Sequence, residues 1–255
     1  MCGIVGYTGH RQAYPVILKG LKRLEYRGYD SSGVALLHNQ NLQVHKKKGK
    51  VADLEETLIG KNLEAQIGIG HTRWATHGEP SDRNAHPHLS SGGEIAMIHN
   101  GIIENYALIK QELVNKGYSF TSDTDTEVLL NFIEDIKKNN ECSLEDAVRI
   151  ALKRVTGAYC ILLIEQSNPD TIIAARKGSP LVIGIGKGEH FLASDASPII
   201  EYTKEVVYVN DYELAIVKPD ELILKNLGNE KITPSSPSSI WNLPRLKKAD
   251  MNISC

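Results

Sequence analysis

The second residue of the chain is a cysteine, and its position could give it unusual chemistry. The sequence begins Met1-Cys2-Gly3, so removal of Met1 would leave a thiol and a free α-amine on one residue. An α-amine has a pKa of about 7.7–8.0, so part of it is unprotonated at neutral pH. It could therefore act as general base for the adjacent nucleophile, directly or through one water. The competing interpretation is an ordinary buried cysteine in a first strand.

Other polar residues could complement such a nucleophile. Asn100 and Gly101 follow a predicted strand over 94–98, and a side-chain NH2 beside a backbone N–H is what an oxyanion hole requires. The same dipeptide would also suit a simple turn. Arg73 offers a planar fork of donors for a carboxylate, and Asp125 could bind an ammonium group. Together these groups predict attack on an amide carried by an amino acid, with glutamine as the first candidate.

Metal and cofactor motifs are weak in this sequence. Histidines are frequent over 71–88, but only His86 and His88 have a spacing that suggests ligands, so we predict no metal site. The glycine-rich run at 184–188 is followed by a predicted strand and not by a helix, which excludes a dinucleotide loop. We therefore expect no cofactor.

The first half of the chain supplies elements that could position these groups. The pattern predicts a buried strand over 2–8, a helix over 14–27 that stops at Gly28, and a hairpin of strands 33–38 and 41–46. The basic run from Lys46 to Lys50 is interpreted as a solvated strand end.

Helices cluster in the middle of the chain and strands follow them. A helix over 105–116 ends at Gly117, a capping box at Thr124 begins the next helix, and Ser143 caps a third. Residues 157–217 are strand-like, with Asn168-Pro169-Asp170 as a turn. Strands at both ends with helices between them predict an α+β architecture of stacked layers.

The domain is expected to span 2–226, and residues 227–255 to form a linker or tail. The Pro- and Ser-rich segment over 233–239 is typical of a linker.

Composition limits the remaining function classes. The 255 residues carry a net charge of −2, which gives no general attraction for nucleic acid or an anionic membrane. No run of some 18 apolar residues occurs, and the N-terminus does not resemble a signal peptide, so we expect a cytoplasmic protein. The cysteines are far apart without a CxxC pair, which excludes a disulfide framework or zinc ribbon: Cys2, Cys142, Cys160 and Cys255.

These motifs, taken in order, resemble the class II glutamine amidotransferases. The resemblance covers about residues 2–225, and the longer matches are to the glucosamine-6-phosphate synthases within that family. The matching segments are Cys2-Gly3-Ile4, residues 24–31, His71 through Gly78, Asn84 through His88, residues 99–105 and Thr124 through Glu127. The resemblance implies the αββα sandwich of N-terminal-nucleophile (Ntn) hydrolases, made of two antiparallel sheets between helical layers.

The resemblance also implies roles for the residues at the reaction centre. Cys2 would form a γ-glutamyl thioester and release ammonia, and Asn100 with Gly101 would form the oxyanion hole. Arg73 and Asp125 would hold the charges of the glutamine backbone.

Further residues would support that centre. Thr76 and His77 would line the pocket, Trp74 would gate the ammonia path, and Arg27 would lie close to the terminal amine. His86 is interpreted only as part of the loop structure.

The family pattern continues beyond a glutaminase domain into sugar-isomerase domains, which we do not expect within these 255 residues. We therefore expect the chain to hydrolyse L-glutamine without making glucosamine 6-phosphate alone, and we expect a homodimer for the longer protein. Two alternatives remain: a non-catalytic module that senses glutamine, and an Ntn amidohydrolase acting on another amide.

Overall fold

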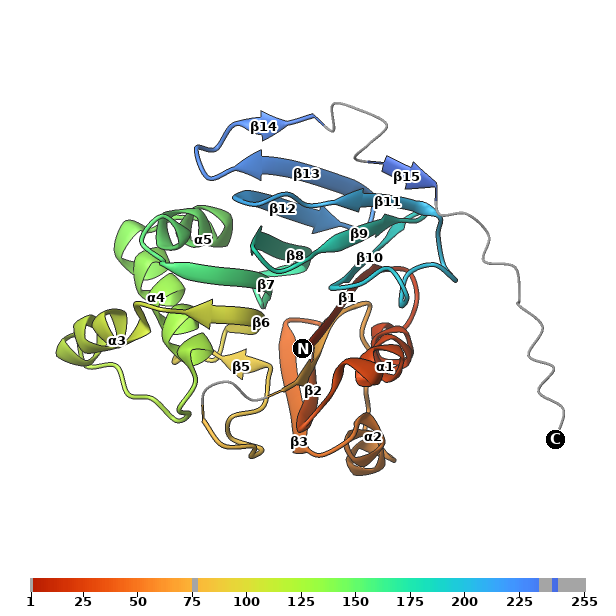
Figure 1. Ribbon diagram of the computed structural model, residues 1–255, viewed down its shortest axis with the longest axis horizontal. Helices are drawn as coiled ribbons and strands as arrows, with labels where there is room; N and C mark the ends of the chain where they lie inside the picture. Colours follow the sequence, from red (N-terminus) through yellow and green to blue (C-terminus); the bar gives the residue numbers. More distant parts are fainter. Residues whose placement is uncertain (1, 75–77, 234–239, 243–255) are drawn as a thin grey trace, which may run out of the picture.

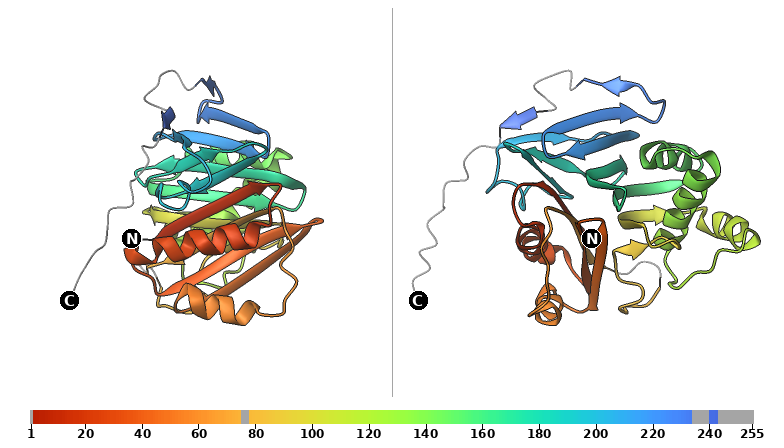
Figure 2. Two further views of the ribbon diagram at one scale, coloured as in Figure 1. Left: turned by 90° about the vertical axis from the view of Figure 1, so that its right-hand side faces the viewer. Right: turned by 180° about the vertical axis from the view of Figure 1, so that it is seen from behind.

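Two antiparallel sheets pack face to face, and helices cover the outer face of each (Figures 1 and 2). The computed structural model describes residues 2–74, 78–233 and 240–242. The predicted α+β class and the αββα order of layers are therefore confirmed. In the described part of the chain, no helix combines the length and the apolar character needed to cross a membrane.

The first sheet holds the N-terminal strand between strands from distant parts of the chain. β1 (Gly3–Gly9) pairs antiparallel with β4 (Ile67–Arg73) on one side and with β10 (Glu189–Ala193) on the other, so Cys2 stands at the end of an interior strand. Among the described residues, the strands of this sheet lie in the order β15 (Ile240–Asn242), β11 (Glu205–Tyr208), β9 (Val182–Ile185), β10 (Glu189–Ala193), β1 (Gly3–Gly9), β4 (Ile67–Arg73), β2 (Ser31–His38) and β3 (Asn41–Lys48).

The second sheet carries the Asn-Gly pair. β6 (Ile95–Ile103) pairs antiparallel with β7 (Gly157–Glu165), which sets Asn100 opposite Cys160 and Gly101 opposite Tyr159. Among the described residues, the strands of this sheet lie in the order β14 (Lys231–Ile232), β13 (Glu221–Asn226), β12 (Glu213–Lys218), β8 (Asn168–Lys177), β7 (Gly157–Glu165), β6 (Ile95–Ile103) and β5 (His88–Leu89).

Helices form the two outer layers. α1 (Ala13–Leu24) and α2 (Val51–Leu58) pack on the first sheet. α3 (Tyr106–Asn115), α4 (Asp125–Asn140) and α5 (Leu144–Leu152) cover the second sheet.

Strand alternation divides the interior into three apolar cores. Successive side chains on a strand point to opposite faces, so neighbouring residues enter different cores. Ile98 lies in the core between the two sheets, whereas Met97 lies in the core under α4 and α5. Ile4 and Val5 on β1 divide in the same way between the inter-sheet core and the core under α1. Both sheets are thus buried on both faces, which holds their strands in a fixed register.

Helix termini follow the predicted signals closely. Thr124 Oγ1 accepts a hydrogen bond from Glu127 N at 3.3 Å, and Ser143 Oγ accepts one from Asp146 N at 3.1 Å. The capping box is only half formed, because the Glu127 carboxylate accepts from Ser122 N instead. The helix expected over 14–27 becomes α1 and a 3₁₀ turn, η1 (Glu25–Arg27), which ends at Gly28 with φ +98°.

Some predicted elements are corrected by the structure. Residues 168–170 begin β8, and the turn lies at Gln166 and Ser167. The basic run ends at α2, a helix the sequence did not suggest. Its first turn is held by Asp53, whose carboxylate accepts from Lys50 N at 2.6 Å.

The expected boundary at 226 stays a prediction. Beyond it, Lys231 and Ile232 pair with β13, and residues 240–242 pair with β11. The tail therefore contributes short strands to both sheets.

Candidate active site

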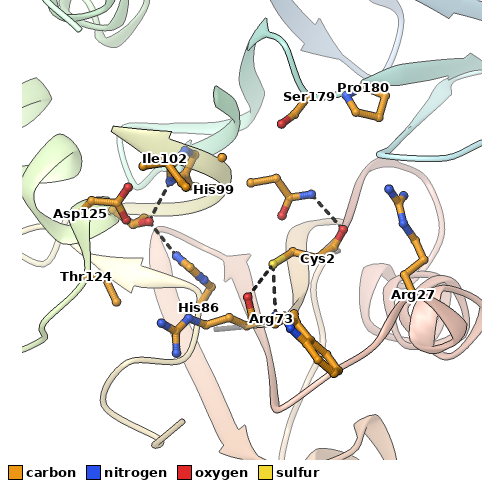
Figure 3. Close-up of a pocket in the computed structure, with 14 residues that line it drawn as sticks. Cys2, Arg27, Arg73, His86, His99, Ile102, Thr124, Asp125, Ser179 and Pro180 are labelled. Carbon is orange, nitrogen blue, oxygen red and sulfur yellow. Dashed lines mark hydrogen bonds between the residues drawn. The ribbon is translucent and has the colours of Figure 1, made fainter. Parts of the chain in front are cut away.

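A cavity of about 380 Å³ opens where the N-terminal end of β1 meets β6 and the start of α4 (Figure 3). Cys2 lies between Arg27 on one side and Asp125 on the other in that view. The residues that line the cavity are Cys2, Arg27, Arg73, Trp74, His86, His99, Asn100, Gly101, Ile102, Thr124, Asp125, Thr126, Ser179 and Pro180.

The thiol of Cys2 is held by the backbone of Trp74. Trp74 N donates to Cys2 Sγ at 3.1 Å, and Sγ donates to Trp74 O at 3.5 Å. Burial raises the pKa of the Cys2 thiol, and the Trp74 N–H partly offsets that effect. The thiol is therefore held in its protonated form at neutral pH, so its use as a nucleophile requires a base.

Arg27 and Trp74 flank the nucleophile in different ways. Arg27 Nη1 donates to Ser194 O and Ser194 Oγ, both at 3.2 Å, and Ser194 Oγ also accepts from Ile4 N at 3.1 Å. Arg27 is thus tied to the strand that carries Cys2. The Trp74 side chain is 55% exposed at the cavity mouth, and its ring lies so close to Gly28 that a Cβ there would collide with it.

Asn100 and Gly101 bring two neutral donors to the same cavity. Asn100 Nδ2 donates to the carbonyl oxygen of Cys2 at 3.1 Å, so its NH2 group faces the nucleophilic residue. Gly101 has φ +133°, and a Cβ there would collide with the carbonyl oxygen of Ala158. Only glycine fits this position, and β6 continues through Asn100 and Gly101 beyond the strand end expected at residue 98.

Arg73 and Asp125 bring two opposite charges into the cavity. Arg73 is 4% exposed at the end of β4, and Asp125 is 5% exposed at the start of α4. Arg73 Nη2 donates to Gly78 O at 3.2 Å, and Asp125 Oδ2 accepts from Ile103 N at 2.8 Å. A buried cavity with one cation and one anion is suited to an amino-acid zwitterion.

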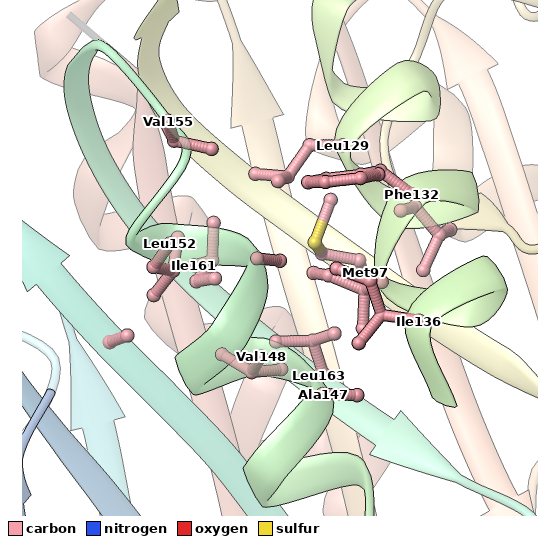
Figure 4. Close-up of a cluster of buried hydrophobic side chains, with 14 of the residues drawn as sticks. Met97, Leu129, Phe132, Ile136, Ala147, Val148, Leu152, Val155, Ile161 and Leu163 are labelled. Atoms are coloured by element: carbon pink, nitrogen blue, oxygen red, sulfur yellow. The ribbon is translucent and has the colours of Figure 1, made fainter. Parts of the chain in front are cut away.

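The position of Asp125 depends on the core beneath its helix. Figure 4 shows Leu129, Phe132 and Ile136 of α4 directed at Met97 of β6. This packing fixes α4 against the strand that bears Asn100.

A layer of four buried histidines lies beside these groups: His71, His86, His88 and His99. Burial lowers the pKa of all four, that of His71 to about 3, so they are neutral at neutral pH.

Two hydroxyls on the α4 N-terminus bind this layer. Thr126 Oγ1 lies 2.9 Å from both His86 Nε2 and His99 Nδ1, and Thr124 Oγ1 lies 3.1 Å from His88 Nε2. His86 thus helps to hold the first turn of α4, a contact its loop position did not suggest. Among the described residues, no group of three or more His, Cys, Asp or Glu side chains has metal-binding geometry.

Five of the predicted site residues line this one cavity, and they come from the residue before β1, from β4, from β6 and from α4: Cys2, Arg73, Asn100, Gly101 and Asp125. Their roles stay predictions. Thr76 and His77 lie outside the described residues. Three further polar residues lie at the site without a predicted role: Thr126, Ser179 and Ser194.

Known proteins match this chain over most of its length. A family described as a glutamine amidotransferase domain matches residues 71–201. The chain is 56% identical over 250 residues to a glutamine–fructose-6-phosphate aminotransferase [isomerizing] of Bacteroides thetaiotaomicron, covering 97% of this chain and 41% of the relative. It is 58% identical over 252 residues to the protein of the same name from Chlorobaculum tepidum, with the same coverage.

A solved structure supports the same relationship. The chain matches a glutamine phosphoribosylpyrophosphate amidotransferase from B. subtilis with TM-score 0.76 and 26% identity, covering 90% of this chain and 50% of the other. This chain therefore spans less than half of the length of the curated relatives that it matches.

Proposed function

Because the chain belongs to the glutamine amidotransferase domain family, we propose that it hydrolyses L-glutamine through the thiol of Cys2. The observation that carries the proposal is a single cavity that holds a thiol, two neutral donors and two opposite charges. Arg73 binds the α-carboxylate of glutamine and Asp125 binds its α-ammonium group. The side-chain amide then reaches Cys2.

Acylation begins when the free α-amine of Cys2, exposed by loss of Met1, takes the thiol proton. The sulfur attacks the amide carbon, and the carbonyl electrons move to oxygen. Asn100 Nδ2 and Gly101 N donate to that oxyanion, which lowers the barrier because both donors are positioned before the reaction begins. When the oxyanion collapses, the C–N bond breaks and the nitrogen takes the proton from the α-ammonium group of Cys2, so ammonia leaves and the amine is neutral again.

Deacylation returns the thiol. Water, deprotonated by the same amine, attacks the γ-glutamyl thioester, and glutamate leaves as the C–S bond breaks. The net reaction converts glutamine and water into glutamate and ammonia.

Supporting roles follow from position. Arg27, held against Ser194, keeps the amine oriented and favours its neutral form by its own charge. Trp74 closes the cavity mouth on the path that ammonia takes. The role expected for Thr76 and His77 at the glutamine pocket stays a prediction.

The names of the relatives suggest the use of the ammonia. We propose that this glutaminase domain supplies a sugar-isomerase domain, which aminates fructose 6-phosphate to glucosamine 6-phosphate. The 255 residues alone should yield no hexosamine with glutamine and fructose 6-phosphate, which a colorimetric hexosamine assay would test. The homodimer of a longer protein and the cytoplasmic location stay predictions.

The decisive test is covalent labelling with a diazoketone analogue of glutamine, read by mass spectrometry. One label on a Met1-free N-terminal Cys2, together with glutamate release from glutamine, is the expected result. Tight glutamine binding without labelling or turnover would favour a sensing module. Hydrolysis of amides that lack the amino-acid charges would favour another amidohydrolase.

A further inference from the structure

One contact of the cavity wall joins the two sheets through side chains alone. His71 on β4 is fully buried, and its Nε2 lies 2.8 Å from Asn100 Oδ1 on β6. On its other side, the Asn100 amide donates from Nδ2 to the carbonyl oxygen of Cys2 at 3.1 Å. The three residues therefore form one chain of hydrogen bonds that ends at the nucleophilic residue.

The carbonyl oxygen of Cys2 fixes which groups donate and which accept in this series of hydrogen bonds. The carbonyl oxygen of Cys2 can only accept, so the Asn100 amide must present NH2 to it. Asn100 Oδ1 then faces His71, and only an N–H at Nε2 completes that contact. With the amide turned over, two oxygens would face each other across the 3.1 Å contact, and the donor at the nucleophile would be lost.

The surroundings keep the His71 ring neutral. Desolvation is the main cause that lowers the pKa of His71, and the charge of Arg73 and the ring of His99 act in the same direction. The ring of His86 packs edge-on at a centroid distance of 4.4 Å. A neutral imidazole holds one proton, and the Asn100 contact requires that proton on Nε2.

We propose that His71 is a positioning residue for the reaction: as the Nε2–H tautomer, it holds the Asn100 amide with its NH2 group toward the oxyanion that forms on the glutamine amide when Cys2 attacks it. This inference rests on the proposed function, because the oxyanion arises only if Cys2 attacks an amide. His71 contacts neither the substrate nor the thiol, so its effect passes through Asn100.

Two variants separate a directed hydrogen bond from packing. His71→Leu removes the donor, and His71→Gln keeps an NH2 donor at similar reach. Loss of one oxyanion donor costs about 10²–10³-fold in kcat. We expect His71→Leu to lower kcat about 10–100-fold with KM changed less than about threefold, and His71→Gln to recover at least about tenfold.

Inhibitor binding separates a role at the oxyanion from a purely structural role of His71. Glutamate γ-semialdehyde forms a hemithioacetal whose oxygen occupies the oxyanion position, whereas glutamate does not. His71→Leu should weaken the semialdehyde by the same factor as kcat and leave glutamate binding unchanged. A matched control is His190→Leu, which removes another buried histidine of the same sheet, bonded to Lys218 O at 2.7 Å. His190→Leu should change neither kcat nor the affinity for the semialdehyde.

Equal loss of kcat, semialdehyde binding and glutamate binding in His71→Leu, without recovery in His71→Gln, would overturn the proposal. So would wild-type kcat in His71→Leu. If His71→Leu does not fold, ¹⁵N NMR of the wild-type chain decides instead: a protonated Nε2 on His71 supports the proposal, and a protonated Nδ1 contradicts it. A wild-type chain that neither turns over glutamine nor binds the semialdehyde would overturn the proposed function, while the NMR result would still test the His71–Asn100 contact.

Discussion

The two sides of the cavity are built differently. The carbonyl side, defined by Cys2, Asn100 and Gly101, lies on or next to the interior strands β1 and β6 and is uncharged. The charged side, defined by Arg73 and Asp125, occupies the last residue of β4 and the first residue of α4.

This difference matches what each side must do. Groups that stabilise a transition state must already be in place, and the pairing of Asn100 and Gly101 with β7 supplies that rigidity. Groups that select an amino acid need full charges, and the ends of a strand and a helix provide room for them. Variants on the carbonyl side should therefore lower kcat, and variants on the charged side should raise KM.

The largest effect is expected at the nucleophile. Cys2→Ala removes the attacking sulfur, so glutamate release should fall at least about 10⁴-fold. Glutamine affinity, measured by calorimetry, should stay within about threefold because Arg73 and Asp125 are untouched. Loss of glutamine binding in this variant would contradict the division between the two sides.

Asn100→Ala should come next. Loss of one oxyanion donor predicts a kcat about 10²–10³-fold lower with little change in KM. Steady-state kinetics would measure both constants. A rise in KM with an unchanged kcat would contradict this, because Asn100 would then act in substrate binding and not on the transition state.

Arg73→Lys should show the opposite pattern. Lysine keeps the charge but loses the planar fork, so KM should rise about 10–100-fold while kcat changes little. Asp125→Asn, which keeps a side-chain oxygen for Ile103 N, serves as the matched variant for the ammonium group. A fall in kcat without a change in KM would contradict this assignment.

The smallest effect concerns stability and pH. The folded-state pKa of His71 is about 3, well below the usual 6.5. The neutral His71 ring therefore contributes fully to the free energy of unfolding above about pH 6.5, and this contribution decreases as the pH falls toward 3. The shift corresponds to about 2 kcal/mol at pH 5. Urea unfolding of the wild-type protein should give a lower free energy of unfolding at pH 5 than at pH 7.5. In His71→Gln this difference between the two pH values should be smaller by about 2 kcal/mol. An unchanged fall in the variant would contradict the burial argument.

Local signals explain which parts of the fold the sequence could predict. The caps at Thr124 and Ser143 and the hairpin turn at Asn39 are short-range features, and the structure confirms them. α2 was missed because its N-cap is Lys50, and its first N–H, on Val51, is satisfied by the distant Glu25 carboxylate at 2.8 Å.

The candidate site likewise contains residues that the sequence could predict and contacts that it could not. Cys2, Arg73, Asn100, Gly101 and Asp125 could be selected because each carries its chemistry in its residue type. The Trp74 contact to the thiol and the alignment of His71 with Asn100 depend on how β4 meets β1 and β6 across two sheets, which no local pattern encodes.

The most direct test of the account compares one chain in two forms, with Met1 removed and with Met1 retained by inhibiting the aminopeptidase during expression. Circular dichroism would establish that both forms fold alike, and glutamate release would be measured for each. Retaining Met1 should lower the rate at least about 10²-fold, because the base beside the Cys2 thiol is then an amide nitrogen. Equal rates for the two forms would contradict it.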